Sequence, residues 1–324
     1  MGKKLIVVDR KGKGDYYYIQ DALDAVRKDN TGIMILVKEG VYYEKIIVDK
    51  PHITLVGELG KNVTLVYDDH LTEAEDATNR LSATTATIRI SATDFSAENI
   101  IFANSASGAE NVEQAVTMYI EADRAQFHHC GFLGRRDTLV TAPTPLHIID
   151  KENEGRPVHL SRQYFRCCYF EGDSNFLAGS STAIFEYCKI HSLNHLGTGY
   201  ITTASTPMGH YFGYVFKNCL LTGDAPKHST YLGRPWKNCP KVAFIQCTLG
   251  EHIHPQGWED ASMCCDFVES GNVGAGADLL ARSPWSRTLT TEEASRYTLE
   301  YIFTDASWCI GTVEYQNKKG SLAS

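Results

Sequence analysis

The sequence predicts an all-β fold, a parallel β-helix, in which the chain winds into stacked coils. Three observations support this prediction: an aromatic and cysteine repeat that occurs five times, short alternating apolar and polar runs around each copy, and uneven spacing between copies. A solenoid tolerates uneven spacing because loops of different length are inserted between strands without disturbing the stack. A short N-terminal capping helix and a C-terminal helical segment complete the predicted architecture.

Each copy of the repeat has an aromatic residue at its first position, a cysteine at its fourth and an apolar residue at its sixth. The copies occupy residues 127–132, 165–170, 185–190, 216–221 and 244–249, and their starts are 38, 20, 31 and 28 positions apart. We expect each copy to be a strand of one coil, with equivalent residues of successive coils stacked about 4.8 Å apart.

The repeated cysteines are expected to face the core as small hydrophobic side chains. They are Cys130, Cys168, Cys188, Cys219 and Cys247. Disulfides and zinc ligation are the alternatives, but the close pairs at 167–168 and 264–265 are adjacent residues and lack C-x-x-C spacing. Ten cysteines without bridges would favour a reducing compartment.

Two segments have helical character. Residues 16–26 place Ile19, Leu23 and Val26 on one face, as expected of a helix that covers the open end of a solenoid. A segment that starts at Thr290 has helical spacing and an acidic first turn, so we expect it to pack against the outside or the far end. No linker or shift in composition divides the chain, and a single domain over residues 1–324 is predicted.

Composition narrows the possible partners. With 324 residues and 43% hydrophobic content the chain can bury a large core, and its formal charge of −8 argues against nucleic acid as a partner. Apolar runs are too short for a membrane span or a secretory signal. The chain as given is therefore expected to be cytoplasmic, or secreted or periplasmic if it is a trimmed mature form.

No metal or cofactor is expected. The histidines at 128–129 and 252–254 are interpreted as structural or solvent-facing. A G-x-S-x-G motif, which would indicate a serine hydrolase, is absent from the sequence.

Five segments together carry a family resemblance. They are GVYYE (40–44), EQAVTMY (113–119), FLGRRDTL (132–139), EGDSNFLAG (171–179) and YLGRPW (231–236). Their order and spacing resemble those of the pectinesterases, or pectin methylesterases, from about Val7 to Trp308, and L-G-R-P-W is the most specific of them. The resemblance implies a right-handed parallel β-helix that hydrolyses methyl esters of galacturonan, with pectin or oligogalacturonides as substrate.

The resemblance also implies roles for individual residues, all on one open groove. Gln114 corresponds to an oxyanion-hole glutamine, Asp137 to the general acid, Arg234 to the arginine beside the nucleophile, and Trp236 to the aromatic residue under the sugar. The remaining substrate contacts that it implies are Tyr43, Thr138 and Phe176.

Two positions depart from the family pattern. Asn175 stands where the family has its nucleophilic aspartate, and Arg136 stands where it has a second glutamine. Several interpretations remain open: an esterase weakened at its nucleophile, an engineered inactivation, a nucleophile displaced to Asp173, or a divergent homologue that binds oligogalacturonides. A polysaccharide lyase or a galacturonase on the same architecture is a further alternative.

Electrostatics add two expectations. A cation at Arg136 should lower the pKa of Asp137, which opposes a general-acid role near neutral pH. Arg135, Arg136 and Arg234 should together form a basic patch suited to a polyanion.

Overall fold

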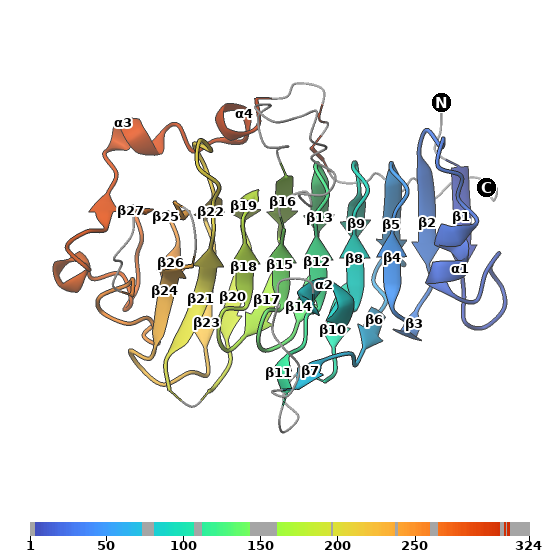
Figure 1. Ribbon diagram of the computed structural model, residues 1–324, viewed down its shortest axis with the longest axis horizontal. Helices are drawn as coiled ribbons and strands as arrows, with labels where there is room; N and C mark the ends of the chain where they lie inside the picture. Colours follow the sequence, from blue (N-terminus) through green and yellow to red (C-terminus); the bar gives the residue numbers. More distant parts are fainter. Residues whose placement is uncertain are drawn as a thin grey trace, which may run out of the picture.

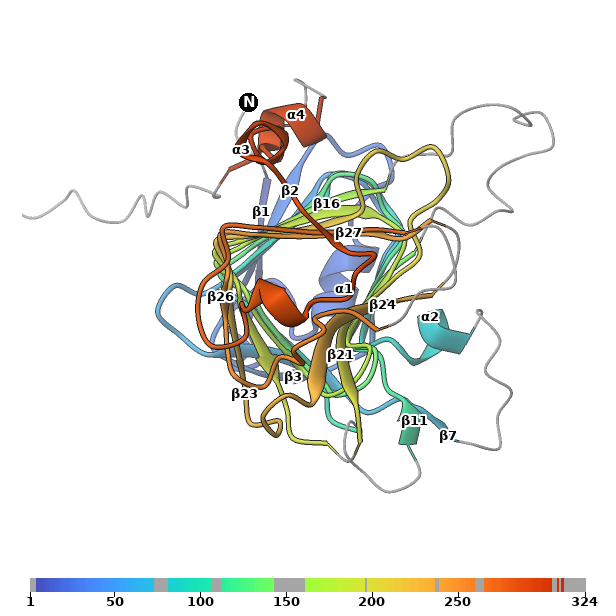
Figure 2. The same cartoon turned by 90° about the vertical axis from the view of Figure 1, so that its left-hand side faces the viewer.

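Parallel strands stack into a β-helix along the long axis of the molecule (Figure 1). The structure, a computed structural model, describes residues 4–72, 81–106, 112–142, 161–195, 197–236, 239–259, 265–304, 308 and 310–311. Seen end-on, three parallel sheets enclose the interior (Figure 2). The predicted all-β solenoid is confirmed.

The first sheet has 11 strands in the described residues. They are β1 (Lys4–Val8), β2 (Ile33–Val37), β5 (Ile53–Gly57), β9 (Ser96–Glu98), β13 (Ala125–His128), β16 (Arg162–Arg166), β19 (Thr182–Glu186), β22 (Tyr214–Lys217), β25 (Lys241–Ile245), β27 (Asp266–Ser270) and β28 (Arg287–Thr288). The second sheet contains β3 (Gly40–Tyr43), β6 (Val63–Tyr67), β10 (Ile101–Asn104), β14 (Gly131–Leu133), β17 (Tyr169–Gly172), β20 (Lys189–Ser192), β23 (Leu220–Gly223) and β26 (Thr248–Leu249).

The third sheet contains β4 (Ile46–Val48), β8 (Ile88–Ile90), β12 (Met118–Ile120), β15 (Leu139–Thr141), β18 (Leu177–Gly179), β21 (Gly199–Ala204) and β24 (Thr230–Pro235). An antiparallel pair, β7 (Leu71–Thr72) and β11 (Val112–Gln114), lies outside the coils beside helix α2 (Leu81–Thr85) (Figure 2). The other helical elements are α1 (Ile19–Asp24), the 3₁₀ helix η2 (Leu279–Ala281), α3 (Thr291–Ala294) and α4 (Leu299–Ile302).

The aromatic and cysteine repeat spans a corner rather than a single strand. In each copy the first-sheet strand ends at the residue after the phenylalanine, and the second-sheet strand begins just after the cysteine. The residue before the cysteine has a positive φ in all five copies: His129, Cys167, Tyr187, Asn218 and Gln246. The prediction of one strand per copy was therefore wrong, because one left-handed residue turns the chain from one sheet to the next.

The repeated phenylalanines form a continuous stack through the core. Strand register aligns Phe127, Phe165, Phe185, Phe216 and Phe244. Adjacent ring centroids lie 4.8, 4.8, 4.5 and 4.4 Å apart. The repeated cysteines are buried beside this stack and unbridged, as predicted. Burial of these rings is a main source of the stability of the coils.

Phe185→Ala is expected to lower the free energy of unfolding by about 3–5 kcal/mol, because it removes a fully buried ring from between two stacked neighbours. Urea unfolding followed by circular dichroism measures the change. Leu280→Ala is the control, because Leu280 is 96% exposed and its truncation should change stability by less than about 0.5 kcal/mol. A Phe185→Ala loss as small as that of the control would contradict the stacked-core interpretation.

The predicted N-terminal helix is confirmed, with Ile19, Leu23 and Val26 buried. It is shorter than the predicted segment because Tyr16 pairs with Val8 as an isolated bridge instead of joining the helix. The carboxylate of Glu44 accepts hydrogen bonds from the backbone N–H groups of Ile19 and Gln20. Glu44 thus fixes the start of α1 at the N-terminal end of the solenoid.

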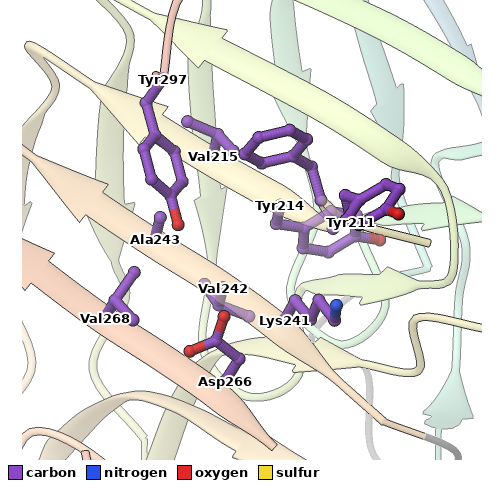
Figure 3. A pocket seen from close by; sticks show the side chains of 11 residues that line it. Tyr211, Tyr214, Val215, Lys241, Val242, Ala243, Asp266, Val268 and Tyr297 are labelled. Carbon is purple, nitrogen blue, oxygen red and sulfur yellow. The ribbon is translucent and has the colours of Figure 1, made fainter. Parts of the chain in front are cut away.

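The C-terminal segment packs on the outer face of the first sheet, one of the two places predicted for it. Thr290 and Glu293 form a capping box at the start of α3. Leu289, Phe303 and Trp308 belong to a second apolar cluster with outward residues of the first sheet. A small pocket lies beside Tyr297 on strands β22, β25 and β27 (Figure 3). No helix among the described residues is long and apolar enough to span a membrane.

Two buried histidines should make stability depend on pH. Burial lowers the pKa of His128 and of His252 to about 4, against about 6.5 in an unfolded chain. Between these values the unfolded chain binds protons that the folded chain does not. The stabilisation is therefore present above pH 6.5 and is lost as the pH falls toward 4, by on the order of 2 kcal/mol for each histidine at pH 5.

Urea unfolding at pH 7 and pH 5 measures this effect. The double variant His128→Gln with His252→Gln should lose less stability between the two pH values than the parent chain. His129→Gln is the control, because His129 is exposed and glutamine already occupies the equivalent left-handed position at Gln246. Equal pH dependence in the double variant and the parent would contradict the prediction.

Candidate active site

Asp137 and Asn175 occupy equivalent positions on adjacent coils, at the turn that leads into the third sheet. Arg136 pairs with Ser174, and Leu139 pairs with Leu177, so the register between them places Asp137 level with Asn175. Their backbones are therefore about 4.8 Å apart. Both are left-handed, with φ of 59° and 55°, a conformation that asparagine and aspartate adopt more readily than most residues.

Gln114 reaches Asp137 from outside the solenoid. It ends β11, and its side-chain Nε2 donates a 2.6 Å hydrogen bond to Oδ2 of Asp137. The antiparallel pairing of β11 with β7 holds this strand beside the coils. A side-chain amide and a carboxyl group 23 residues apart in sequence are thereby brought into contact.

Asn175 is held by the following coil. Its backbone N–H donates to the carbonyl oxygen of Tyr200 at 2.8 Å, and its Oδ1 accepts a 2.7 Å hydrogen bond from Oγ1 of Thr203. The side chain is almost completely buried. The sequence did not indicate Thr203 or Tyr200 as site residues. The G-Y-I-T-T-A segment that contains them is typical of a strand, and only strand register shows that this strand lies beside Asn175.

Arg234 lies one coil further on, paired in register with Thr203. Its guanidinium carbon is 4.7 Å from the ring centroid of Tyr200 and 5.8 Å from that of Trp236. Its Nε is buried and has no hydrogen-bond partner among the residues that the structure describes. Trp236 is half-exposed. The arginine is thus oriented by aromatic faces rather than by a carboxylate.

Burial raises the pKa of Asp137 above its ordinary value. This effect outweighs the hydrogen bond from Gln114 and the charges of Arg136 and Arg234, which lower the pKa. The expectation of a lowered pKa was therefore wrong in its net direction, although Arg136 acts with the predicted sign. Removal of water from the carboxyl group disfavours its charged form more than the nearby cations favour it. A raised pKa suits a general acid.

Arg135 does not contribute a free charge to the predicted basic patch. Its Nε donates to Oδ2 of Asp173 at 3.0 Å, and its Nη2 donates to the carbonyl oxygen of Asn194. Arg136 is exposed, and within the described ranges neither Arg136 nor Arg234 forms an ion pair. The patch is reduced to these two cations. The same ion pair occupies Asp173, which argues against a displaced nucleophile there.

A family model described as Pectinesterase matches residues 5–306. The chain belongs to the pectinesterase family. Pectinesterase 31 of Arabidopsis thaliana is 32% identical over 317 residues, covering 93% of this chain and 92% of that protein. A pectinesterase of Petunia integrifolia is 31% identical over 325 residues, covering 92% of this chain and 79% of that protein.

Solved structures agree with the family. Pectin methylesterase from carrot superposes with a TM-score of 0.80 at 25% identity, covering 95% of each chain. The Aspergillus niger pectin methylesterase in deglycosylated form gives a TM-score of 0.73 at 27% identity, covering 90% of this chain and 91% of that one. The right-handed parallel β-helix expected of a pectinesterase is confirmed.

The structure buries two of the side chains predicted as substrate contacts of a pectinesterase, Phe176 and Thr138. Phe176 has no exposed surface and belongs to the main core cluster. A Cβ at Gly172 would lie 2.1 Å from Cβ of Phe176, so the glycine leaves the space that this inward packing needs. Thr138 is also fully buried, and its Oγ1 donates to the carbonyl oxygen of Glu171. Both side chains support the turn from inside.

Tyr43 is exposed but distant from the pectinesterase site. It ends β3 and stacks on Tyr67 with ring centroids 5.1 Å apart. Register through β6 and β10 places Tyr43 three coils from Leu133, on the coil of Asp137. Three coils are about 14 Å, so a contact with the sugar at Asp137 is excluded, whereas a role for Tyr43 further along a polymer stays a prediction.

Outward residues of the third sheet form the surface beside the site. Strand register aligns them in one row: Ile47, Arg89, Tyr119, Val140, Ala178, Thr203 and Arg234. The row runs along the solenoid axis, past the turn that carries Asp137 and Asn175. A linear polymer laid along this row would pass the whole pectinesterase site.

Proposed function

We propose that this chain hydrolyses methyl esters of galacturonan, in pectin or in oligogalacturonides, and that Asn175 makes it slow. The observation that carries the proposal is the Gln114–Asp137 hydrogen bond, which forms one coil from Asn175 and three coils from the strand that carries Arg234. The family and the relatives named above support the reaction type.

Asp137 is proposed to act as the acid that protonates departing methoxide. Its raised pKa keeps a larger protonated fraction at a given pH than an exposed aspartate would have. Gln114 supplies an amide N–H donor beside it, suited to the oxyanion that forms when the ester carbonyl becomes tetrahedral.

Asn175 removes the step that a carboxylate would perform. An aspartate at this position would attack the ester carbonyl to form an anhydride and release methanol, and water would then hydrolyse the anhydride. A neutral amide is a far poorer nucleophile, so we expect the barrier to rise by about 4 kcal/mol or more. Direct attack of water on the ester is the route that remains.

Methanol release from methylated oligogalacturonides tests the proposal. Slow release above the enzyme-free rate is expected, and it should disappear in Asp137→Asn. Two parallel readouts address the other reaction types: absorbance of an unsaturated product for a lyase, and new reducing ends for a galacturonase. A signal in either of these without methanol would overturn the esterase proposal.

A further inference from the structure

Among the residues that the structure describes, Arg234 forms no ion pair with a carboxylate. Oδ1 of Asn175 accepts its hydrogen bond from Thr203. Nε of Arg234 is buried and has no hydrogen-bond partner in the part of the chain that the structure describes. A buried polar group without a partner is costly, so such a group in a site indicates a ligand that completes it.

The charge balance around Arg234 favours an anion as that ligand. Arg136 and Arg234 have no ion pairs among the described residues, and position 175 is neutral. Three carboxyl groups lie near these cations, Asp137, Asp173 and Glu259, and each already accepts a hydrogen bond from a neighbouring side chain. An arriving carboxylate therefore meets two cations that have no ion-pair partner among the described residues, and it meets no carboxylate at position 175.

The geometry of Arg234 also suits a carboxylate. Its guanidinium lies over Tyr200 and near Trp236, which limit its orientation from the side of the rings. Pre-orientation lowers the entropy lost when the fork-shaped guanidinium forms two parallel N–H···O bonds to a carboxylate. Trp236 is half-exposed and offers an apolar face to the sugar ring that bears the carboxylate.

We infer that Asn175 makes this site a receptor for the free carboxylate of galacturonate, bound by Arg234, so that the chain binds de-esterified galacturonan more tightly than the methyl ester. The inference rests on the proposed function for its ligand class. An aspartate at position 175 would repel a second carboxylate and compete for the arginine, whereas asparagine does neither. At this position an aspartate would favour hydrolysis of the ester, whereas an asparagine favours binding of the free acid that hydrolysis produces.

Binding measured by calorimetry at pH 7 tests the inference, with a free-acid oligogalacturonide and its fully methyl-esterified counterpart of equal length. The parent chain should bind the free acid at least about tenfold more tightly. Asn175→Asp should weaken free-acid binding by about tenfold or more; only the free acid is used with this variant, because it would consume the ester. Arg234→Gln should weaken free-acid binding by a similar factor and leave ester binding nearly unchanged.

Two further variants make the test specific. Arg234→Lys keeps the charge but loses the fork, so an intermediate loss is expected, and circular dichroism checks that each variant folds. Arg287→Gln is the matched control, because Arg287 pairs with Asp266 and Glu293 on the first sheet. Free-acid binding should be unchanged in this control.

The two proposals fail in different ways. Faster methanol release by Asn175→Asp together with unchanged free-acid affinity would overturn the receptor inference and leave the esterase proposal standing. Weaker free-acid binding by Asn175→Asp without methanol release from any variant would support the receptor and overturn the esterase. Equal affinity of the parent chain for acid and ester would also overturn the receptor inference.

Discussion

Replacing Asn175 with aspartate is expected to raise the rate of methanol release from methylated oligogalacturonides by about a thousandfold or more. The substitution is nearly isosteric, and aspartate tolerates the left-handed backbone of this position, as Asp137 does on the preceding coil. Arg234 lies two coils beyond position 175, and its positive charge is expected to hold the new nucleophile ionised. Initial rates under saturating substrate measure the effect.

Asn218→Asp is the matched control for this change. Asn218 also has a left-handed backbone, with φ of 54°, but it lies at the corner between the first and second sheets. Its substitution should leave methanol release unchanged. The double variant Asn175→Asp with Arg136→Gln shows whether Arg136 limits the reaction, because it restores the amide that the family has there. No gain in either Asn175→Asp variant would contradict the assigned nucleophile position.

Asp137→Asn in the Asn175→Asp background is expected to lower the rate by about 10²–10⁴-fold, because it removes the acid that protonates methoxide. Asparagine is the informative substitution, since it accepts the left-handed φ of 59° and can still hydrogen-bond Gln114. Alanine would add backbone strain to the loss of the acid. Methanol release is the measurement.

The pH profile of the Asn175→Asp variant gives a second readout of the same role. A general acid works in its protonated form, so the rate should fall as the pH rises through the raised pKa of Asp137. Asp29→Asn is the control, because Asp29 is exposed and pairs with Arg27 far from the turn. Full activity of the Asp137→Asn variant would show that another group protonates the leaving group.

The fold was largely predictable from the spacing of side chains. A phenylalanine and a cysteine at fixed separation in each copy indicated stacked coils, because equivalent residues must fill the same place in every coil. The repeat did not indicate that the chain turns from one sheet to the next between the phenylalanine and the cysteine. The left-handed residue is histidine, cysteine, tyrosine, asparagine or glutamine, and no shared side chain marks that backbone conformation.

The site was predicted in part. Gln114, Asp137 and Asn175 were expected to converge, and they do, through a side-chain hydrogen bond and through strand register. The burial of Phe176 was not predicted, because its motif does not reveal which side of the turn its ring occupies. Thr203 was missed because its contact with Asn175 depends on which strand comes next in the sheet.

The sequence by itself determined the coil repeat, the apolar residues of the capping helix, the family, and the chemical deficit at position 175, since an amide lacks a carboxylate's nucleophilicity wherever it lies. Only the tertiary structure decided how the charges balance. Neighbouring cations suggested a lowered pKa for Asp137, but burial, which depends on the packing of segments distant in sequence, reverses the direction. Likewise, the contacts of Arg234 depend on the stacking of coils: Thr203 bonds Asn175 on one side and pairs with Arg234 on the other, and Nε of Arg234 has no hydrogen-bond partner among the described residues.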